Sequence, residues 1–243
     1  MTETTRKIVV VGDGMVGKTA LLSAFVNGAF QDYYIPTVFE TSAKEVELPD
    51  GRHITLGLWD TGGQEEFDQI RQLAYPGASL ILLCYAVDCP TSLENIVHTW
   101  LDEVKCYCPH IPLILVGCKA DKRVVPKAGN LNNSASNATQ NTLIDPNDAV
   151  KVCKQIGAQI VIECSALTRS NVNSIFELAA RIILDTDKES MRSSKFCSIL
   201  PIHRKKSISS NGAVAGKSII TRRSSELKRR ISSSNYFCFL RRR

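Results

Sequence analysis

The feature that most constrains this chain is the glycine-rich stretch GDGMVGKT at residues 12–19, which directly follows the β-branched run Ile8–Val11. A buried strand that stops at glycine and continues into a helical pattern, here Thr19–Asn27, is typical of a phosphate-binding loop. The glycines let backbone N–H groups point at phosphate oxygens, and the start of the helix adds positive partial charge. We therefore expect Lys18 to contact the β- and γ-phosphates of a nucleotide and Thr19 to bind Mg²⁺.

A second motif, Asp60-Thr61-Gly62-Gly63-Gln64-Glu65, follows a predicted strand at residues 53–59. An acid at the end of a strand beside the phosphate-binding loop reaches Mg²⁺ through a water molecule. Gly63 leaves a backbone N–H free for the γ-phosphate, and Gln64 is suited to orient an attacking water. A turn of this composition is common in proteins, but downstream of a phosphate-binding loop it indicates nucleotide hydrolysis.

Short apolar runs alternate with helical patterns as far as residue 185, which predicts an α/β sheet covered on both faces. The turn Pro49-Asp50-Gly51 makes one pair of strands an antiparallel hairpin, and the other strands are expected to be parallel. The predicted strands are 7–11, 43–48, 53–59, 80–87, 113–117 and 160–164, and the predicted helices are 19–27, 92–106 and 172–184.

The charge of the chain is divided between two parts. Residues 1–186 hold 15 Lys and Arg against 21 Asp and Glu, whereas residues 187–243 hold 15 against 3. We therefore expect an acidic folded domain at 1–186 and a basic, serine-rich tail at 187–243 that is disordered when free and binds an anionic partner. Inside the domain, the polar low-complexity stretch 130–141 predicts a surface insertion near 126–143.

Other features exclude several classes of protein. No apolar stretch reaches the roughly 18 residues of a membrane-spanning helix, and the polar start Met1–Lys7 has no apolar segment behind it, unlike a secretory signal. The nine scattered cysteines then favour reduced thiols in the cytoplasm, and their spacing does not match a zinc site.

Six segments together resemble one family: GDGMVGKT, YIPTVFE at 34–40, WDTGGQEEFDQIR at 59–71, SLEN at 92–95, CP at 108–109 before ILVGCKAD, and ECSALT at 163–168. From Arg6 to Asp185 the chain resembles the small GTPases of the Ras superfamily, within the Rho/Rac branch. The resemblance implies a P-loop NTPase fold of the G-domain type, with a six-stranded, mostly parallel sheet flanked by five helices. Guanine nucleotide would bind at the carboxyl ends of the strands, as ligands do in open α/β sheets.

Carried over residue by residue, the resemblance implies GTP or GDP as ligand and Mg²⁺ as cofactor. Thr19 and Thr37 would bind the metal, Asp60 would act through a water molecule, and Gln64 would be the catalytic residue. The nucleotide-binding residues would be Gly12, Asp13, Gly14, Met15, Val16, Gly17, Lys18, Thr19, Ala20, Phe30, Tyr34, Thr37, Asp60, Gly63, Cys118, Lys119, Asp121, Ser165, Ala166 and Leu167. The effector loop would contain Tyr34, Pro36, Val38, Phe39 and Glu40.

The choice of guanine rests on two loops of that resemblance. Asp121, in Lys119-Ala120-Asp121, would accept hydrogen bonds from the ring N–H and amino group of guanine, a pair of donors that adenine does not offer. The backbone N–H of Ala166 would contact the guanine O6. Both features argue against an unrelated ATPase with the same phosphate-binding loop.

Three positions depart from the family pattern. Gly62 replaces a usual alanine, and its backbone freedom is expected to misplace Gln64 and slow hydrolysis. Cys118 replaces Asn or Thr, so we expect weaker ties between the base and phosphate loops and faster nucleotide exchange. Ser42 replaces an aromatic residue of the effector surface, so the family's effectors cannot be assumed.

The tail also departs, because the family usually ends in a prenylated cysteine box and this chain ends in three arginines. Cys197 would form such a box if a shorter form ended at Leu200; alternatively, residues 201–243 are an extension and Cys197 stays unmodified. Cys238 is a palmitoylation candidate beside the basic clusters, which are expected to bind an anionic membrane surface.

Two functional hypotheses follow. The first is a Rho-type switch that binds GTP with Mg²⁺, engages effectors and hydrolyses GTP to GDP, served by exchange factors and GTPase-activating proteins. The alternative is a hydrolysis-poor, constitutively GTP-bound interaction module controlled through its tail. By resemblance we expect a monomer, with no specific nucleic-acid partner, that acts in the cytoplasm and on the cytoplasmic face of membranes, the plasma membrane above all. The process would be actin organisation, cell polarity or secretion.

Overall fold

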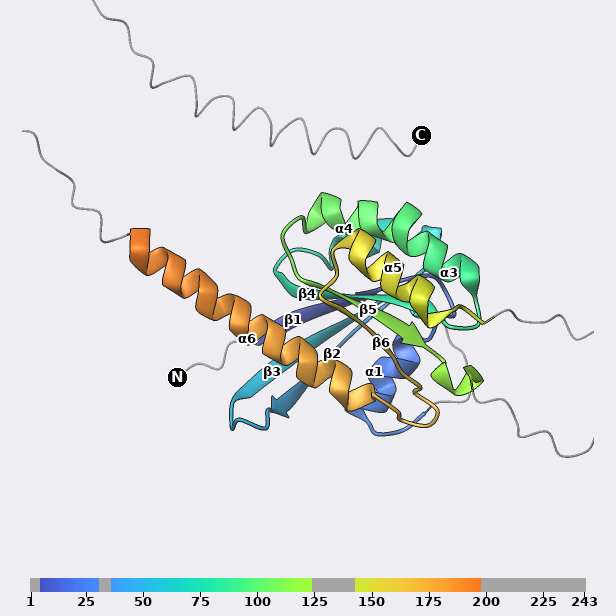
Figure 1. The fold of residues 1–243 in the computed structure, drawn as a ribbon, viewed down its shortest axis with the longest axis horizontal. Helices are drawn as coiled ribbons and strands as arrows, with labels where there is room; N and C mark the ends of the chain where they lie inside the picture. Colours follow the sequence, from blue (N-terminus) through green and yellow to red (C-terminus); the bar gives the residue numbers. More distant parts are fainter. Residues whose placement is uncertain (1–4, 31–35, 124–142, 198–243) are drawn as a thin grey trace, which may run out of the picture. The chain divides into compact units, whose positions relative to one another are not determined.

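A computed structural model describes residues 5–30, 36–123 and 143–197, with side chains through Lys188. Its centre is a six-stranded sheet in the order β2-β3-β1-β4-β5-β6 (Figure 1). Among the described strands, β2 and β3 are antiparallel and the other neighbours are parallel, which confirms the predicted sheet. The strands are β1 (Arg6–Val11), β2 (Phe39–Glu47), β3 (His53–Thr61), β4 (Ala78–Ala86), β5 (Leu113–Cys118) and β6 (Ile160–Glu163).

Helices cover both faces of the sheet, so its central strands are buried on both sides (Figure 1). Side chains of α1 and α6 pack in one core, and those of α3, α4 and α5 pack in the other. The helices are α1 (Lys18–Val26), α2 (Asp68–Gln72), α3 (Pro90–Asn95), α4 (Leu101–Tyr107), α5 (Pro146–Ile156) and α6 (Val172–Cys197), with 3₁₀ turns η1 (Glu65–Phe67) and η3 (Ala120–Arg123) and a π turn η2 (Ile96–Trp100). Because α3, η2 and α4 run on without a break, the described helices correspond to the five expected.

The predicted hairpin is present at the end of the sheet. Gly51 has a left-handed backbone, with φ of 77°, and its N–H donates to the Leu48 carbonyl. The chain can turn there without steric cost because glycine has no Cβ. Both strands extend further toward the phosphate-binding loop than predicted, since β2 begins at Phe39 and β3 ends at Thr61.

Two helix predictions need correction. The helix expected at 92–106 runs from Pro90 to Tyr107 and contains the π turn η2. The helix expected to end at 184 continues to Cys197, into the segment predicted to be disordered. Residues 185–197 contain no Gly or Pro, so no residue in that segment breaks the helix.

The sequence patterns did not predict α2 or α5. The helix α5 nevertheless carries clear boundary signals: the Asp145 side chain accepts a hydrogen bond from the Asn147 N–H, and Gly157 closes the helix with a left-handed backbone. An N-cap acid followed by proline and a terminal glycine are recognised helix limits.

Some sequence-based expectations lie outside the described residues. They concern Tyr34, the insertion near 126–143 and the tail beyond 197, which includes Cys238. Within the described residues, none of the helices combines the length and apolar character needed to cross a bilayer.

Candidate nucleotide-binding site

The phosphate-binding loop joins β1 to α1 and is shaped by close backbone contacts. A Cβ on Gly12 would lie 2.1 Å from the Cys84 carbonyl oxygen, so only glycine fits there. The buried Lys18 ammonium donates hydrogen bonds to the Gly12 and Asp13 carbonyl oxygens, at 2.7 and 2.8 Å. Burial lowers the Lys18 pKa, although Cys84 and Asp60 oppose this shift. The backbone of the loop therefore surrounds the Lys18 ammonium and holds its positive charge where a phosphate would bind.

Three oxygen-bearing side chains meet beside this loop. The Thr19 and Thr37 hydroxyl oxygens lie 2.8 Å apart, close to the roughly 2.9 Å that separates adjacent ligands of an octahedral Mg²⁺ ion. Neither carboxylate oxygen of the buried Asp60 has a hydrogen-bond partner among the described residues. Burial raises the Asp60 pKa to about 6. Hard oxygen donors and a buried carboxylate that Lys18 compensates only in part fit Mg²⁺.

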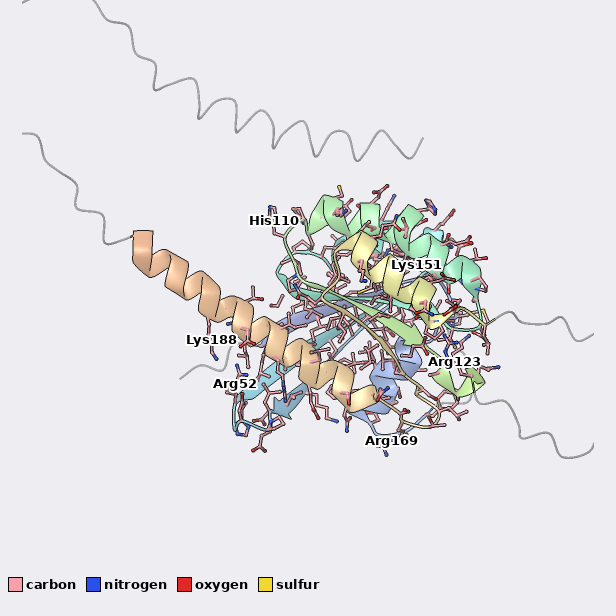
Figure 2. The ribbon with its side chains drawn as sticks, viewed as in Figure 1. Arg52, His110, Arg123, Lys151, Arg169 and Lys188 are labelled. Atoms are coloured by element: carbon pink, nitrogen blue, oxygen red, sulfur yellow. The ribbon has the colours of Figure 1, made fainter. Side chains whose placement is uncertain are left out.

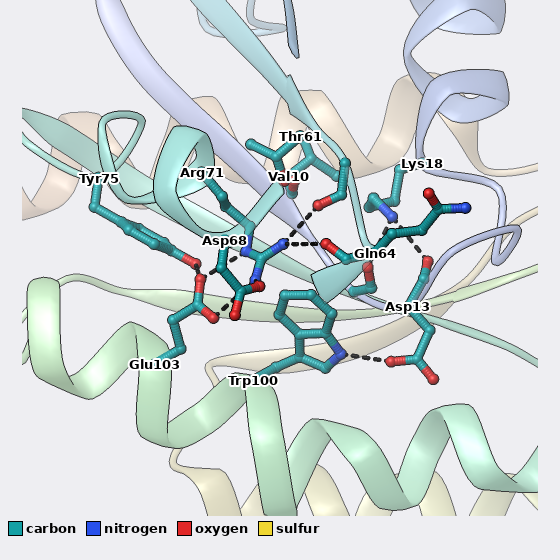
Figure 3. Close-up of polar contacts among 12 residues, drawn as sticks. Val10, Asp13, Lys18, Thr61, Gln64, Asp68, Arg71, Tyr75, Trp100 and Glu103 are labelled. Carbon is teal, nitrogen blue, oxygen red and sulfur yellow. Dashed lines mark hydrogen bonds and ion pairs between the residues drawn. The ribbon is translucent and has the colours of Figure 1, made fainter. Parts of the chain in front are cut away.

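A buried arginine holds the segment that contains Gln64 (Figure 3). The Arg71 Nη1 donates to the Gly62 carbonyl at 2.7 Å and to the Gln64 carbonyl at 3.4 Å. Its Nε donates to Glu103 at 2.7 Å, and the Tyr75 hydroxyl donates to the same carboxylate at 2.7 Å. Burial by itself would lower the Arg71 pKa, but its hydrogen bond to Glu103 and the Glu103 charge raise it. The backbone on both sides of Gly63 is thus anchored to α4.

The same network reaches the phosphate-binding loop. The Trp100 Nε1 and Asn95 Nδ2 each donate to the Asp13 carboxylate at 2.7 Å. The Arg71 guanidinium lies 4.7 Å from the centre of the Trp100 ring, within cation–π range. The Asp13 carboxylate thus joins the helical segment α3–η2 to the loop. Nucleotide binding by Asp13 stays a prediction, which its backbone rather than this side chain would fulfil.

Gly62 has a packing role that the sequence did not reveal. A Cβ at this position would lie 2.5 Å from the Phe67 ring and 2.7 Å from the Thr37 carbonyl oxygen. The Gly62 N–H also donates to the Val38 carbonyl at 3.2 Å. The missing side chain therefore lets the segment before Gln64 lie directly against the segment that contains Thr37.

The base-reading loops converge at the carboxyl ends of β5 and β6. The Ser165 hydroxyl donates to the Asp121 carboxylate at 2.5 Å, and it accepts from the Thr168 N–H at 3.1 Å. Arg123, which is labelled in Figure 2, forms two hydrogen bonds to Glu163, and these tie η3 to β6. Ser165 thus orients Asp121 and lies behind it, out of the cavity described next.

These elements surround a cavity of about 700 Å³. Most of the predicted residues line it: Gly14, Met15, Gly17, Lys18, Thr19, Ala20, Phe30, Thr37, Gly63, Gln64, Cys118, Lys119, Asp121, Ala166 and Leu167. The effector-loop candidates Pro36 and Glu40 line it too.

Other predicted residues do not line the cavity. Gly12, Asp13, Val16, Asp60 and Ser165 support its walls, and Val38 and Phe39 lie outside it. Five further residues line the cavity that were not predicted from the sequence: Leu21, Thr61, Gly62, Lys122 and Cys164. Each of them is next in sequence to a predicted residue, so extending each motif by one residue would have found them.

Comparison with known proteins agrees with this geometry. A sequence model described as the Ras family matches residues 7–185. The chain is 46% identical over 180 residues to GTP-binding protein rho5 of Schizosaccharomyces pombe, covering 74% of this chain and 88% of that one. It is 43% identical over 198 residues to GTP-binding protein RHO1 of Candida albicans, covering 82% and 97%. With a Ras-type fold and a cavity lined by the phosphate, magnesium and guanine motifs, the chain belongs to the Ras family as a Rho-type small GTPase, whose members bind GTP or GDP with Mg²⁺ and hydrolyse GTP.

Proposed function

We propose that this GTPase is a cycling switch rather than a permanently GTP-bound module. The observation that carries this proposal is the anchored backbone around Gln64, because Arg71 holds the carbonyls of both Gly62 and Gln64. Gly14 faces Gln64 without a side chain, and a Cβ there would lie 3.7 Å from the Gln64 Cγ. Catalysis of phosphoryl transfer depends mainly on positioning, so a held glutamine favours turnover.

Thr19, Thr37 and Asp60 would hold Mg²⁺, which supplies charge neutralisation at the phosphates when bound. Lys18 would bind the phosphates, and Asp121 with the Ala166 N–H would select guanine. Arginine from an activating protein would complete the site, and an exchange factor would reload it. Intrinsic turnover of order 10⁻⁴ s⁻¹ is therefore expected.

Effectors would contact the exposed apolar side chains near the two loops that sense the γ-phosphate. Val38, Ile70 and Leu73 are 45%, 39% and 73% exposed. Since Gly62 joins Val38 through a backbone hydrogen bond, a change at the nucleotide would reach this surface directly. The process served would be actin organisation, polarity or secretion.

We further propose that the monomeric protein acts at the cytoplasmic face of membranes, the plasma membrane above all. The support is compositional: clusters such as 204–206 and 228–230 are basic, and each charge gains about 1 kcal/mol at an anionic leaflet.

Single-turnover hydrolysis of preloaded GTP by the full chain tests the proposal, with and without a Rho-type activating domain. A Gln64→Leu variant, which cannot orient water, is the matched control. A slow rate that the activator accelerates supports a switch. A parent rate equal to that of Gln64→Leu, unresponsive to the activator, would make the chain a standing GTP-bound module.

A further inference from the structure

Two thiols lie side by side beneath the guanine end of the cavity. Cys118 is the last residue of β5, and Cys164 follows the last residue of β6. The β5–β6 register pairs Gly117 with Glu163, and the Cys164 N–H then donates to the Gly117 carbonyl at 2.7 Å. This hydrogen bond belongs to the Gly117–Glu163 pair and keeps the two strands in register at its end, so the next residues, Cys118 and Cys164, lie opposite each other.

This pairing gives the two cysteines the geometry of a disulfide site. Opposite residues on neighbouring strands have Cα atoms about 4.8 Å apart and side chains on the same face. Disulfides form when the Cα separation is about 4.4–6.8 Å. Both side chains pack in the core shared with α1 and α6, and both line the same cavity.

We propose that a hydroperoxide converts Cys118 and Cys164 to a disulfide that joins the two positions from which the guanine-reading loops begin. Cys118 leads directly into Lys119-Ala120-Asp121, and Cys164 leads into Ser165-Ala166-Leu167. Both residues are 3% exposed or less, yet both line the nucleotide cavity, which is therefore the route by which an oxidant reaches them. Bound nucleotide covers that route.

The oxidation of the two thiols proceeds in two steps. The Cys118 thiolate attacks the O–O bond, giving a sulfenic acid and releasing hydroxide, or the corresponding alkoxide. The Cys164 sulfur then attacks the Cys118 sulfur, and hydroxide leaves with the Cys164 proton as water. Cys118 is the more exposed of the two thiols, at 3% against 1%, and it lies beside Gly17 of the phosphate-binding loop, so it is the attacking thiol. The neighbouring thiols lower the Cys118 pKa and raise that of Cys164, which acts in the same sense.

The disulfide would weaken nucleotide binding. An S–S bond of about 2.04 Å is much shorter than a contact between two thiols, so Cys118 and Cys164, and the starts of the loops that follow them, must move closer to each other. Cys118 also supports the phosphate-binding loop, since a Cβ on Gly17 would lie 3.3 Å from the Cys118 Cβ. Weakening one hydrogen bond to the Asp121 carboxylate predicts nucleotide release about tenfold faster. This effect rests on the proposed function, whereas disulfide formation does not.

The test treats the full chain with hydrogen peroxide, either nucleotide-free or loaded with GDP and Mg²⁺. Mass spectrometry should find tryptic peptide 106–119 joined to 155–169 in the nucleotide-free sample, with fragment ions placing the link at Cys118 and Cys164. Cys118→Thr and Cys164→Ser should each remove the link, and circular dichroism with a cooperative thermal transition under reducing conditions verifies the fold of each variant. Cys89→Ser, at an exposed thiol, should keep the link.

The second readout is release of a fluorescent GDP analogue that is loaded either onto reduced protein or onto protein already oxidised in the nucleotide-free state, because bound nucleotide covers the thiols. Oxidation should accelerate release about tenfold, and dithiothreitol should restore the starting rate. In Cys118→Thr, oxidation should leave the release rate of the variant unchanged. A Cys118 link to Cys84 alone, no link at all, or a link without faster release would overturn the proposal. Failure of the reduced parent to bind GDP would instead refute the proposed function.

Discussion

The contact between Gly62 and its neighbours makes a prediction opposite to the sequence-based expectation. Glycine was expected to misplace Gln64, so alanine at position 62 would restore hydrolysis. In the structure, an alanine Cβ would lie 2.5 Å from the Phe67 ring and 2.7 Å from the Thr37 carbonyl oxygen. The ring can rotate away, but the carbonyl belongs to the backbone that carries the Thr37 ligand.

Overpacking of this kind costs about 1–3 kcal/mol. If the cost falls on the arrangement in which Thr37 contacts Thr19, that arrangement becomes roughly 5- to 150-fold less populated. Since hydrolysis requires Thr37 and Gln64 in place, Gly62→Ala should slow single-turnover GTP hydrolysis by a similar factor. GDP affinity should change little, because Thr37 is held by the triphosphate state.

The assay is single-turnover hydrolysis by the parent, Gly62→Ala, Phe67→Ala, and the variant that combines the two substitutions. The double variant removes the ring but keeps the backbone clash, so it should recover part of the rate, and the cycle separates the two contacts. A Gly62→Ala rate at or above that of the parent would refute the packing argument. It would instead support the expectation that the backbone freedom of Gly62 misplaces Gln64.

Three further predictions concern the buried polar groups. Glu103→Ala leaves the buried Arg71 with Asp68 as its remaining acidic partner and should lower the free energy of unfolding by about 3 kcal/mol in urea denaturation, with Glu103→Gln losing less; a loss below about 1 kcal/mol would show that the pair is not structural. Ser165→Ala removes the hydroxyl that orients Asp121 and should weaken GDP binding in a fluorescence titration by about tenfold, whereas unchanged affinity would mean that Asp121 is oriented otherwise. The Asp60 pKa is raised to about 6, so the folded protein binds a proton there that the unfolded chain releases. In metal-free protein, this group therefore makes stability fall as pH rises from about 4 to 6. Mg²⁺ needs the ionised carboxylate, so the Mg²⁺-induced rise in melting temperature should be smaller at pH 5 than at pH 7.5, and a Mg²⁺ response equal at both pH values would contradict this reasoning.

The sequence by itself determined the features that are local in the chain. The phosphate-binding loop was predictable because glycine, strand and helix follow one another within a few residues, and the backbone there admits little else. Asp121 and Ala166 were found in the same way, through short motifs after buried strands. The two helix limits that failed, in α3–α4 and α6, depended on weak boundary signals, and propensity alone does not decide where a helix ends.

Only the tertiary structure decided which distant residues meet. Arg71 and Glu103 are 32 positions apart, and Asp13 and Trp100 are 87 apart. Nothing in the sequence links the members of either pair, because an acid in a loop or an arginine in a short helix is usually solvated. The parallel β5–β6 register likewise set Cys118 opposite Cys164. Such contacts follow from strand order and helix packing, which bring together side chains that no local pattern connects.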